Sequence, residues 1–277
     1  LQFLQMLGNP LASHGRYRRL LILHLPCLEQ IDMCKVSKEE KVRYSESQPC
    51  ITPELARSHC IMGDSSASSG LLSAGEFYLP SLSLHKVRGD WTSQVEVLQL
   101  NYQKLASLGG IEVLKNLRRA SFIGNMIKEL KGIEACRALE ELSLEDNLIS
   151  EIESLSELSL LKKLDLGRNF IRKIQGLDQL SCLTQLSLED NLIRSLSGIQ
   201  EIKTLLELYI GNNQLQSIKE VQVLKNLENL LILDISGNSF TKEDSRLYIV
   251  FHLKKLKVLD GVPIEKTEQA NARDCFG

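Results

Sequence analysis

The sequence predicts an α/β solenoid in which short parallel strands stack into one sheet and the chain returns behind it. Three observations lead to this prediction. A pattern of 22 residues occurs four times in register between Leu117 and Thr204, apolar residues recur at fixed places within it, and asparagine stands at place 9 of every copy. A fixed period of this length indicates stacked supersecondary units that bury a continuous core only together.

Each copy begins with a predicted strand, counted from place 1 at Leu117. Places 4 and 6 are apolar, and because side chains alternate across a strand they point into the core, whereas places 3, 5 and 7 face outward. Apolar residues at places 11, 14, 17 and 20 continue the core along the return segment. A coil of 22 residues leaves little room for a full α-helix there, so we expect extended or 3₁₀ segments.

The asparagines at place 9 are predicted to form a ladder inside the coil. After each strand the chain turns sharply and leaves buried backbone groups, which an amide satisfies because it carries both donors and an acceptor. Glycine at place 16 suits a tight bend, with serine as the exception in one copy. The residues at place 9 are Asn125, Asn147, Asn169 and Asn191, and those at place 16 are Gly132, Ser154, Gly176 and Gly198.

The form L-x-x-L-x-L-x-x-N-x-I-x-x-I-x-G-L resembles the leucine-rich repeat. It is similar to the short subclass found in a regulatory subunit of protein phosphatase one and in an axonemal dynein light chain. The resemblance implies a leucine-rich-repeat solenoid with a curved parallel sheet on the concave side, short 3₁₀ or extended convex segments and a C-terminal helical cap.

Residues 1–45 are predicted to be the last repeat and the cap of a first, truncated array, with further coils upstream. The segment that follows the first asparagine shares its plan with the end of the chain: His24 aligns with His252, and Asp32 aligns with Asp260. This plan resembles the capping motif of intracellular leucine-rich-repeat arrays, in which a helix covers the last coil and a Leu-Asp turn ends it. A solenoid needs such a cap because its last coil otherwise exposes the core, so two caps indicate two arrays.

The rest of the chain is divided into three predicted segments. Residues 46–82 contain a Ser/Gly-rich stretch and are expected to form a flexible linker. Residues 83–265 form the second array and its cap, with seven repeat strands and an opening cover within 79–94, and residues 266–277 form a tail. The coil at 205–229 has 25 residues, and its three extra residues are placed on the return side.

Composition limits the classes of function. The formal net charge is −2 with both signs interspersed, and no apolar run is long enough to span a bilayer, so we expect neither nucleic acid nor membrane as a partner. The seven cysteines include no C-x-x-C pair, and Cys136 and Cys182 are expected to be small buried apolar residues. Cysteine usage without paired spacing predicts a cytoplasmic protein; the resemblance adds a ciliary or cytoskeletal location as an alternative.

The sequence contains no pattern of catalytic, phosphate-binding or metal-binding spacing, so we expect no enzyme, no cofactor and no metal. The adjacent acids at 145/146 and 189/190 are expected to be a solvated face rather than a pair for acid/base catalysis. A shared position in the two caps makes His24 and His252 candidates for a functional role, but we expect both to cap or pack locally within the cap helix.

The outward places predict a protein-binding surface on which carboxylates outnumber basic residues. Place 10 is apolar in four coils and either forms an exposed row along one rim, with Phe170 as the anchor, or lies partly under the next coil. Both interpretations are open from the sequence. The predicted partner-binding residues are Met126, Glu145, Leu148, Asp165, Phe170, Glu189, Leu192, Glu207 and Tyr209.

We therefore expect a non-enzymatic scaffold for protein–protein interaction that holds a partner with a basic surface against a rigid, preformed concave face. The resemblance implies two alternatives. The first is a protein phosphatase regulatory subunit, whose partner would be a phosphatase catalytic subunit. The second is a structural component of the ciliary axoneme, whose partner would be an axonemal protein.

Overall fold

The computed structural model describes residues 3–4, 30–31, 34–35, 56, 59–62, 91–240 and 245–277. The chain forms two compact units, Leu1–Pro49 and Cys50–Gly277. In the first unit, β1 (Phe3–Leu4) pairs in parallel with β2 (Gln30–Ile31), and β2 pairs antiparallel with β3 (Cys34–Lys35). The remaining residues of the predicted first array lie outside the described part of the chain.

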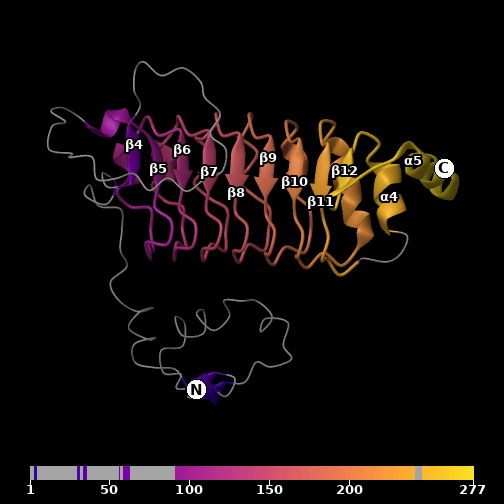
Figure 1. The fold of residues 1–277 in the computed structure, drawn as a ribbon, viewed down its shortest axis with the longest axis horizontal. Coiled ribbons are helices and arrows are strands. Elements are labelled where there is room, and N and C mark those ends of the chain that lie inside the picture. The colour runs from indigo at the N-terminus through magenta and orange to yellow at the C-terminus, as the bar shows by residue number, and fades with distance from the viewer. Residues whose placement is uncertain are drawn as a thin grey trace. The chain divides into compact units, whose positions relative to one another are not determined.

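The second unit is organised around a single sheet of ten strands in the order β13 to β4 (Figure 1). Neighbours from β5 to β12 are parallel, and places 3, 4 and 5 of one repeat strand pair with the same places of the next. The seven predicted repeat strands are confirmed as β5 (Val95–Gln99), β6 (Arg119–Ser121), β7 (Glu141–Ser143), β8 (Lys163–Asp165), β9 (Gln185–Ser187), β10 (Glu207–Tyr209) and β11 (Ile232–Asp234).

The return segments are extended or 3₁₀, as the coil length predicts. The 3₁₀ helices are η4 (Ile111–Val113), η5 (Ile133–Ala135), η6 (Ile199–Glu201) and the longer η7 (Ile218–Asn226), which lies in the 25-residue coil. The bend before η6 requires glycine, because Gly198 has φ of 101° and a Cβ atom there would lie 2.1 Å from the carbonyl oxygen of Ile174.

The amide ladder is confirmed, and its asparagines are buried. Each Nδ2 from Asn125 to Asn213 donates to a carbonyl three residues earlier and to another in the preceding coil, while Oδ1 accepts from a backbone N–H of that coil. Asn147, for example, donates to Leu144 at 3.0 Å and to Phe122 at 2.8 Å, and accepts from Ile127 at 3.1 Å. One side chain therefore satisfies buried groups of two coils at once.

The core is a continuous stack of leucine and isoleucine side chains between the sheet and the return segments. Burial of one such side chain contributes roughly 1.5–3 kcal/mol, so stacking neighbours is the main source of stability. Cys136 is part of this core and its burial raises the pKa of the thiol to about 12, whereas Cys182 is half-buried. The prediction of a buried cysteine thus holds fully for Cys136 only.

Charged side chains at place 2, just before each strand, connect the first coils. Glu140 lies between Arg118 and Lys162: Arg118 Nε donates to its Oε1 at 2.7 Å, and Lys162 Nζ donates to its Oε2 at 2.7 Å. Together with Glu96, the signs alternate from coil to coil. These hydrogen bonds, first that from Lys162 and then that from Arg118, lower the pKa of Glu140.

The opening edge of the sheet differs from the prediction. Residues 60–62, within the segment predicted to be a flexible linker, form β4 (Cys60–Met62), which pairs antiparallel with β5. Ala56 belongs to the core, so a segment before the predicted cover closes this end. Of the predicted cover, residues 91–94 form the 3₁₀ turn η3 (Trp91–Gln94), and residues 79–90 lie outside the described part.

The closing end is a helical cap, as predicted. It consists of α4 (Ser245–His252), β12 (Val258–Leu259), β13 (Val262–Pro263) and α5 (Lys266–Phe276). Leu233 pairs with Leu259 here as Leu4 pairs with Ile31 in the first unit, and an antiparallel strand follows in both places.

The segment predicted to be only a tail is the helix α5, which packs against α4. Arg246 on α4 holds Glu268 on α5 with two hydrogen bonds, from Nε to Oε1 at 2.5 Å and from Nη2 to Oε2 at 3.2 Å. Its Nη1 also donates to the carbonyl of Leu259 at 2.9 Å. The bidentate pair ties α4 to α5, and the third hydrogen bond ties α4 to β12.

Candidate functional site

The outward side chains of β5 to β11 form the concave face, where they are ordered by the sheet register. At place 5, Asp165 lies between Ser143 and Ser187, and two coils further Tyr209 lies beside Asp234. Because the backbone is fixed by pairing on both sides, this surface exists before any partner binds, which lowers the conformational entropy lost on binding.

Place 8 follows each repeat strand and has a left-handed backbone in all seven coils. The φ angle is 64° at Asp146 and 52° at Asp190, and Asn or Gly occupies this place in three other coils. These residue types adopt positive φ at low cost, so the backbone explains part of the Glu-Asp pattern seen in the sequence. Tyr102 and Arg168, with φ of 60° and 53°, depart from that preference.

Five carboxylates form a cluster on the concave face around Glu189. The cluster, called the acidic cluster below, consists of Glu145, Asp165, Glu189, Asp190 and Asp234. Burial raises the pKa of Glu189, and the neighbouring charges, first that of Asp234 and then that of Asp190, raise it further. Negative charge is therefore concentrated at a partly desolvated point of the surface.

Arg168 is the basic side chain that reaches the acidic cluster from within the same surface. Its Nε lies 3.6 Å from Glu145 Oε1 and 3.7 Å from Asp190 Oδ2, and its side chain is 60% exposed. Ion pairs of this length and exposure stabilise weakly. One such cation does not neutralise five carboxylates, so the cluster keeps a negative field.

Tyr209 and Glu207 form a fixed pair at one side of the cluster. Tyr209 Oη donates to Glu207 Oε2 at 2.9 Å. Burial, together with this hydrogen bond and the charge of Glu207, raises the pKa of Tyr209 to about 12. The phenol therefore stays protonated, and the half-buried ring lies beside carboxylates.

Comparison with known proteins agrees with this geometry. The family model described as "Leucine-rich repeat" matches residues 123–277, which is more than half of the chain. The chain is a member of the leucine-rich-repeat family.

Two solved structures are similar to this leucine-rich-repeat chain. An internalin of Listeria monocytogenes strain 4b F2365 is 26% identical, with a TM-score of 0.55, and the match covers 62% of this chain and 49% of the internalin. The chain thus spans about half the length of that protein. Internalin C2 of the same strain is 21% identical with a TM-score of 0.49, over 61% of this chain and 81% of that one.

The row at place 10 of the leucine-rich repeats lies mostly under the neighbouring coil. Met126 and Leu148 are 7% and 5% exposed, whereas Phe170 and Leu192 are half-buried. The interpretation of an exposed row therefore fails for Met126 and Leu148, whereas Phe170 and Leu192 fit the alternative of a partly covered row. The backbone N–H of place 10 donates to the preceding coil in all four copies, at 2.9 Å from Leu148 to Ile127 for example, so this bond positions the row but does not set how far each side chain is buried.

The structure thus brings together Glu145, Asp165 and Glu189 of the predicted set, with Glu207 and Tyr209 beside them, and removes Met126 and Leu148 from the accessible surface. It adds Asp190 and Asp234 to that set. Asp234 occupies place 5 of the seventh strand and could have been found by extending the place numbering by one coil.

Within residues 91–240 and 245–277, together with the short described segments before them, no group of three or more His, Cys, Asp or Glu side chains could hold a metal ion. No helix among the described residues is long and apolar enough to cross a membrane.

Proposed function

We propose that this chain is an interaction scaffold that binds a protein with a basic surface on its concave face. Leucine-rich-repeat domains generally mediate protein–protein interaction, and proteins with this fold are typically non-enzymatic scaffolds. The observation that carries the proposal is the acidic cluster, in which Glu189 is held among four other carboxylates on a preformed sheet. A cationic partner would relieve the repulsion within the cluster, and that relief adds to the affinity.

Phe170 and Tyr209 are the proposed apolar contacts of this surface. Both side chains are half-buried, and aromatic residues beside charged ones commonly dominate binding energy at interfaces. Leu192 extends the rim next to Phe170 by one coil. The carboxylates would select and orient the partner, while the rings supply apolar area.

The test is a proximity-labelling experiment with the full-length protein and two variants. Glu145→Gln/Glu189→Gln/Asp190→Asn removes charge at constant shape, and Asn is tolerated at the positive φ of position 190. The matched control, Glu129→Gln/Glu151→Gln/Glu153→Gln, removes three exposed carboxylates outside the cluster. We expect the cluster variant alone to lose its labelled partners; an unchanged partner list would contradict the proposal.

The two narrower alternatives, a phosphatase regulatory subunit and a structural component of the axoneme, rest on the repeat subclass alone. Each alternative predicts a specific result of the same experiment. A phosphatase catalytic subunit, or axonemal proteins, should appear among the partners that the cluster variant loses. The cytoplasmic location also remains a prediction, and the labelled partners would indicate the compartment directly.

A further inference from the structure

The surface at the start of the repeat strands changes from charged to apolar along the stack (Figure 1). In the first three coils, charged side chains at places 2 and 3 line one depression. They are Glu96, Arg118, Arg119, Glu140 and Glu141. From the sixth coil onward leucine stands at place 2, where Leu206 and Leu231 are 36% and 39% exposed.

The two exposed leucines are neighbours. The N–H of Leu231 donates to the carbonyl of Leu206 at 2.8 Å, which places the two backbones side by side in adjacent coils. At place 3, the half-buried Ile232 follows Leu231 and pairs with the half-buried Val258 of β12. The four residues Leu206, Leu231, Ile232 and Val258 are called the apolar patch below. Exposed apolar residues that adjoin one another within a polar rim are typical of contact sites.

Polar and charged residues border the apolar patch. At place 2, Thr184 precedes Leu206, and the exposed Lys257 follows Leu231. At place 3, Glu207 precedes Ile232 on the neighbouring strand. The patch therefore covers the sixth and seventh coils and the first strand of the cap.

The apolar patch lies on the same strands as part of the acidic cluster. Ile232 and Asp234 both point outward from β11, two residues apart, which corresponds to about 7 Å along the strand. Glu189, at place 7, follows β9, which pairs with β10. Place 3 and place 7 are separated by about 13 Å. The patch thus continues the surface on which the partner is proposed to bind.

An α-helix that lies across the strands matches this surface in size. A helix with its side chains is about 10–12 Å wide, close to the distance of about 13 Å between places 3 and 7. Its turns repeat every 5.4 Å or so, against about 4.8 Å between strands, so successive turns meet successive coils. An extended segment in the same direction presents side chains on one face only every ~6.6 Å and falls out of step sooner.

The length of this surface sets the length of the helix. The acidic cluster extends from Glu145 in the third coil to Asp234 in the seventh. Four strand spacings are about 19 Å, which corresponds to roughly 13 helical residues.

We infer that the partner presents a basic amphipathic helix, which places leucine- or phenylalanine-sized side chains on the apolar patch and lysine or arginine side chains on the acidic cluster. This inference rests on the proposed function and names the kind of partner. The carboxylates select the cationic side of the helix, and the patch selects its apolar side. Lys257 repels a basic side chain at the patch, so the helix has one preferred rotation about its axis.

The test begins with a random peptide library displayed on phage and selected on the full chain. We expect enriched peptides with Leu or Phe at helical spacing and Lys or Arg on the opposite side. The affinity of a fluorescently labelled selected peptide, measured by anisotropy, should fall about fivefold or more in Leu206→Thr/Leu231→Thr, because apolar contact area is lost. Threonine stands at this place in the fifth coil, as Thr184, and circular dichroism checks that the variant folds.

Two variants serve as matched controls. Val113→Thr/Leu160→Thr changes two apolar residues outside the patch that are 50% and 49% exposed. Leu206→Met/Leu231→Met keeps the patch apolar. The affinity of both should stay within about twofold of the unchanged chain. A proline in the middle of the peptide should lower the affinity about tenfold or more, because it breaks a helix.

The outcomes separate this inference from the proposed function. If Glu145→Gln/Glu189→Gln/Asp190→Asn abolishes binding but Leu206→Thr/Leu231→Thr or the proline does not weaken it, the proposed function stands and the helix is wrong. Peptide binding that neither variant of the chain changes would contradict both.

Two further outcomes would also overturn the inference. One is a selection without basic amphipathic peptides. The other is self-association of the chain, seen by sedimentation, that Leu206→Thr/Leu231→Thr abolishes, since the occupant of the patch would then be a second copy.

Discussion

The side-chain amide of Asn169 donates to the carbonyl oxygen of Leu144, one coil earlier, at 3.0 Å. The same side chain accepts from the N–H of Ile149 at 3.0 Å, and it is fully buried. Removing it leaves buried backbone groups of two coils without partners, so Asn169→Ala should lower the free energy of unfolding by about 3 kcal/mol or more. Chemical denaturation measures this change.

The control for the ladder is Asn229→Ala. Asn229 also donates to a carbonyl of the preceding coil, that of Lys203, at 3.0 Å, but it is exposed and water can replace it. We expect a loss of about 0.5 kcal/mol or less. Equal losses of unfolding free energy at the two positions would mean that burial does not account for the contribution of the ladder to stability.

Gly198→Ala and Gly261→Ala separate steric from conformational requirements. Both glycines have positive φ, 101° and 74°, but a Cβ at Gly198 would lie 2.1 Å from a backbone oxygen, whereas none of the described atoms lies within 4 Å of one at Gly261. Gly261→Ala should cost about 1 kcal/mol from the left-handed backbone alone. Gly198→Ala should cost at least about twice as much, as thermal or chemical unfolding would show.

Glu189→Gln is expected to stabilise the fold at neutral pH. Burial and neighbouring carboxylates raise the folded-state pKa of Glu189, so its ionisation costs the folded state free energy at pH 7. The gain should be about 0.5 kcal/mol or less, because the group is partly exposed and screened, and it should vanish below about pH 4.3, where the carboxyl is protonated in both states. Glu153→Gln, at an exposed position, is the control and should change little.

Glu140→Gln should have the opposite sign. Hydrogen bonds from Lys162 and Arg118 lower the folded-state pKa of Glu140, so its carboxylate stabilises the fold above the unfolded pKa and loses that contribution as pH falls. We expect a loss of about 0.5–1 kcal/mol at pH 7, with the difference from the unchanged chain shrinking below about pH 4.3. A loss that does not depend on pH would contradict the assigned cause.

Arg246 and Glu268 should be coupled through their bidentate contact. Their side chains are 31% and 19% exposed, so a double-mutant cycle to alanine should give about 1–2 kcal/mol. The matched pair is Arg137 and Glu157, which lie 2.8 Å apart but are 73% and 48% exposed. Their coupling should be about 0.5 kcal/mol or less, and similar values for both pairs would show that α5 is not held by this contact.

The regular part of the fold could be predicted because one copy of the repeat specifies the others. The inward leucines and the place of Asn147 or Asn169 follow from period and alternation alone. Strand β4 could not be predicted in the same way, because three residues outside the repeat carry no periodic signal. Helix α5 was missed although Lys266–Phe276 contains good helix formers, since its stability depends on a contact with Arg246, far from it in the sequence.

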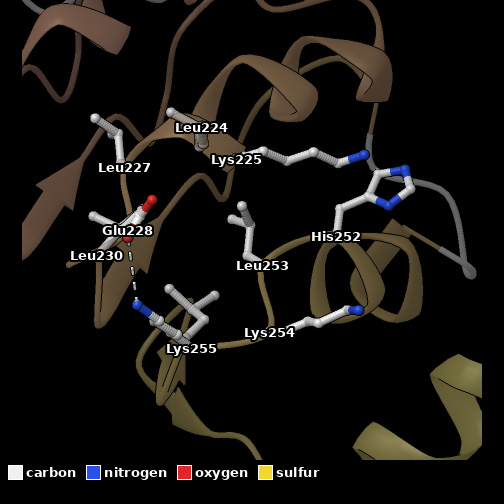
Figure 2. A pocket seen from close by; sticks show the side chains of 10 residues that line it. Leu224, Lys225, Leu227, Glu228, Leu230, His252, Leu253, Lys254 and Lys255 are labelled. Atoms are coloured by element: carbon white, nitrogen blue, oxygen red, sulfur yellow. Dashed lines mark ion pairs between the residues drawn. The ribbon is translucent and has the colours of Figure 1, made fainter. Parts of the chain in front are cut away.

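In the candidate sites, too, only the features that follow from the repeat pattern could be predicted. Alternation along strands placed Glu145, Asp165 and Glu189 on the concave face, and the structure brings them together. The burial of place 10 differs among the coils although the pattern and the backbone hydrogen bond are the same, so the pattern does not encode it. The small pocket between η7 and the cap (Figure 2) depends on packing between the 25-residue coil and the cap, which no repeat pattern encodes.

Antiparallel strands close both sides of the stack of parallel ones, β4 at one end and β13 at the other. Pro263 in β13 has no N–H to offer to an incoming strand. A strand that paired with this edge would therefore lack one backbone hydrogen bond. With an antiparallel strand at each edge, the parallel part of the concave face has a fixed length, that of the seven repeat strands and β12.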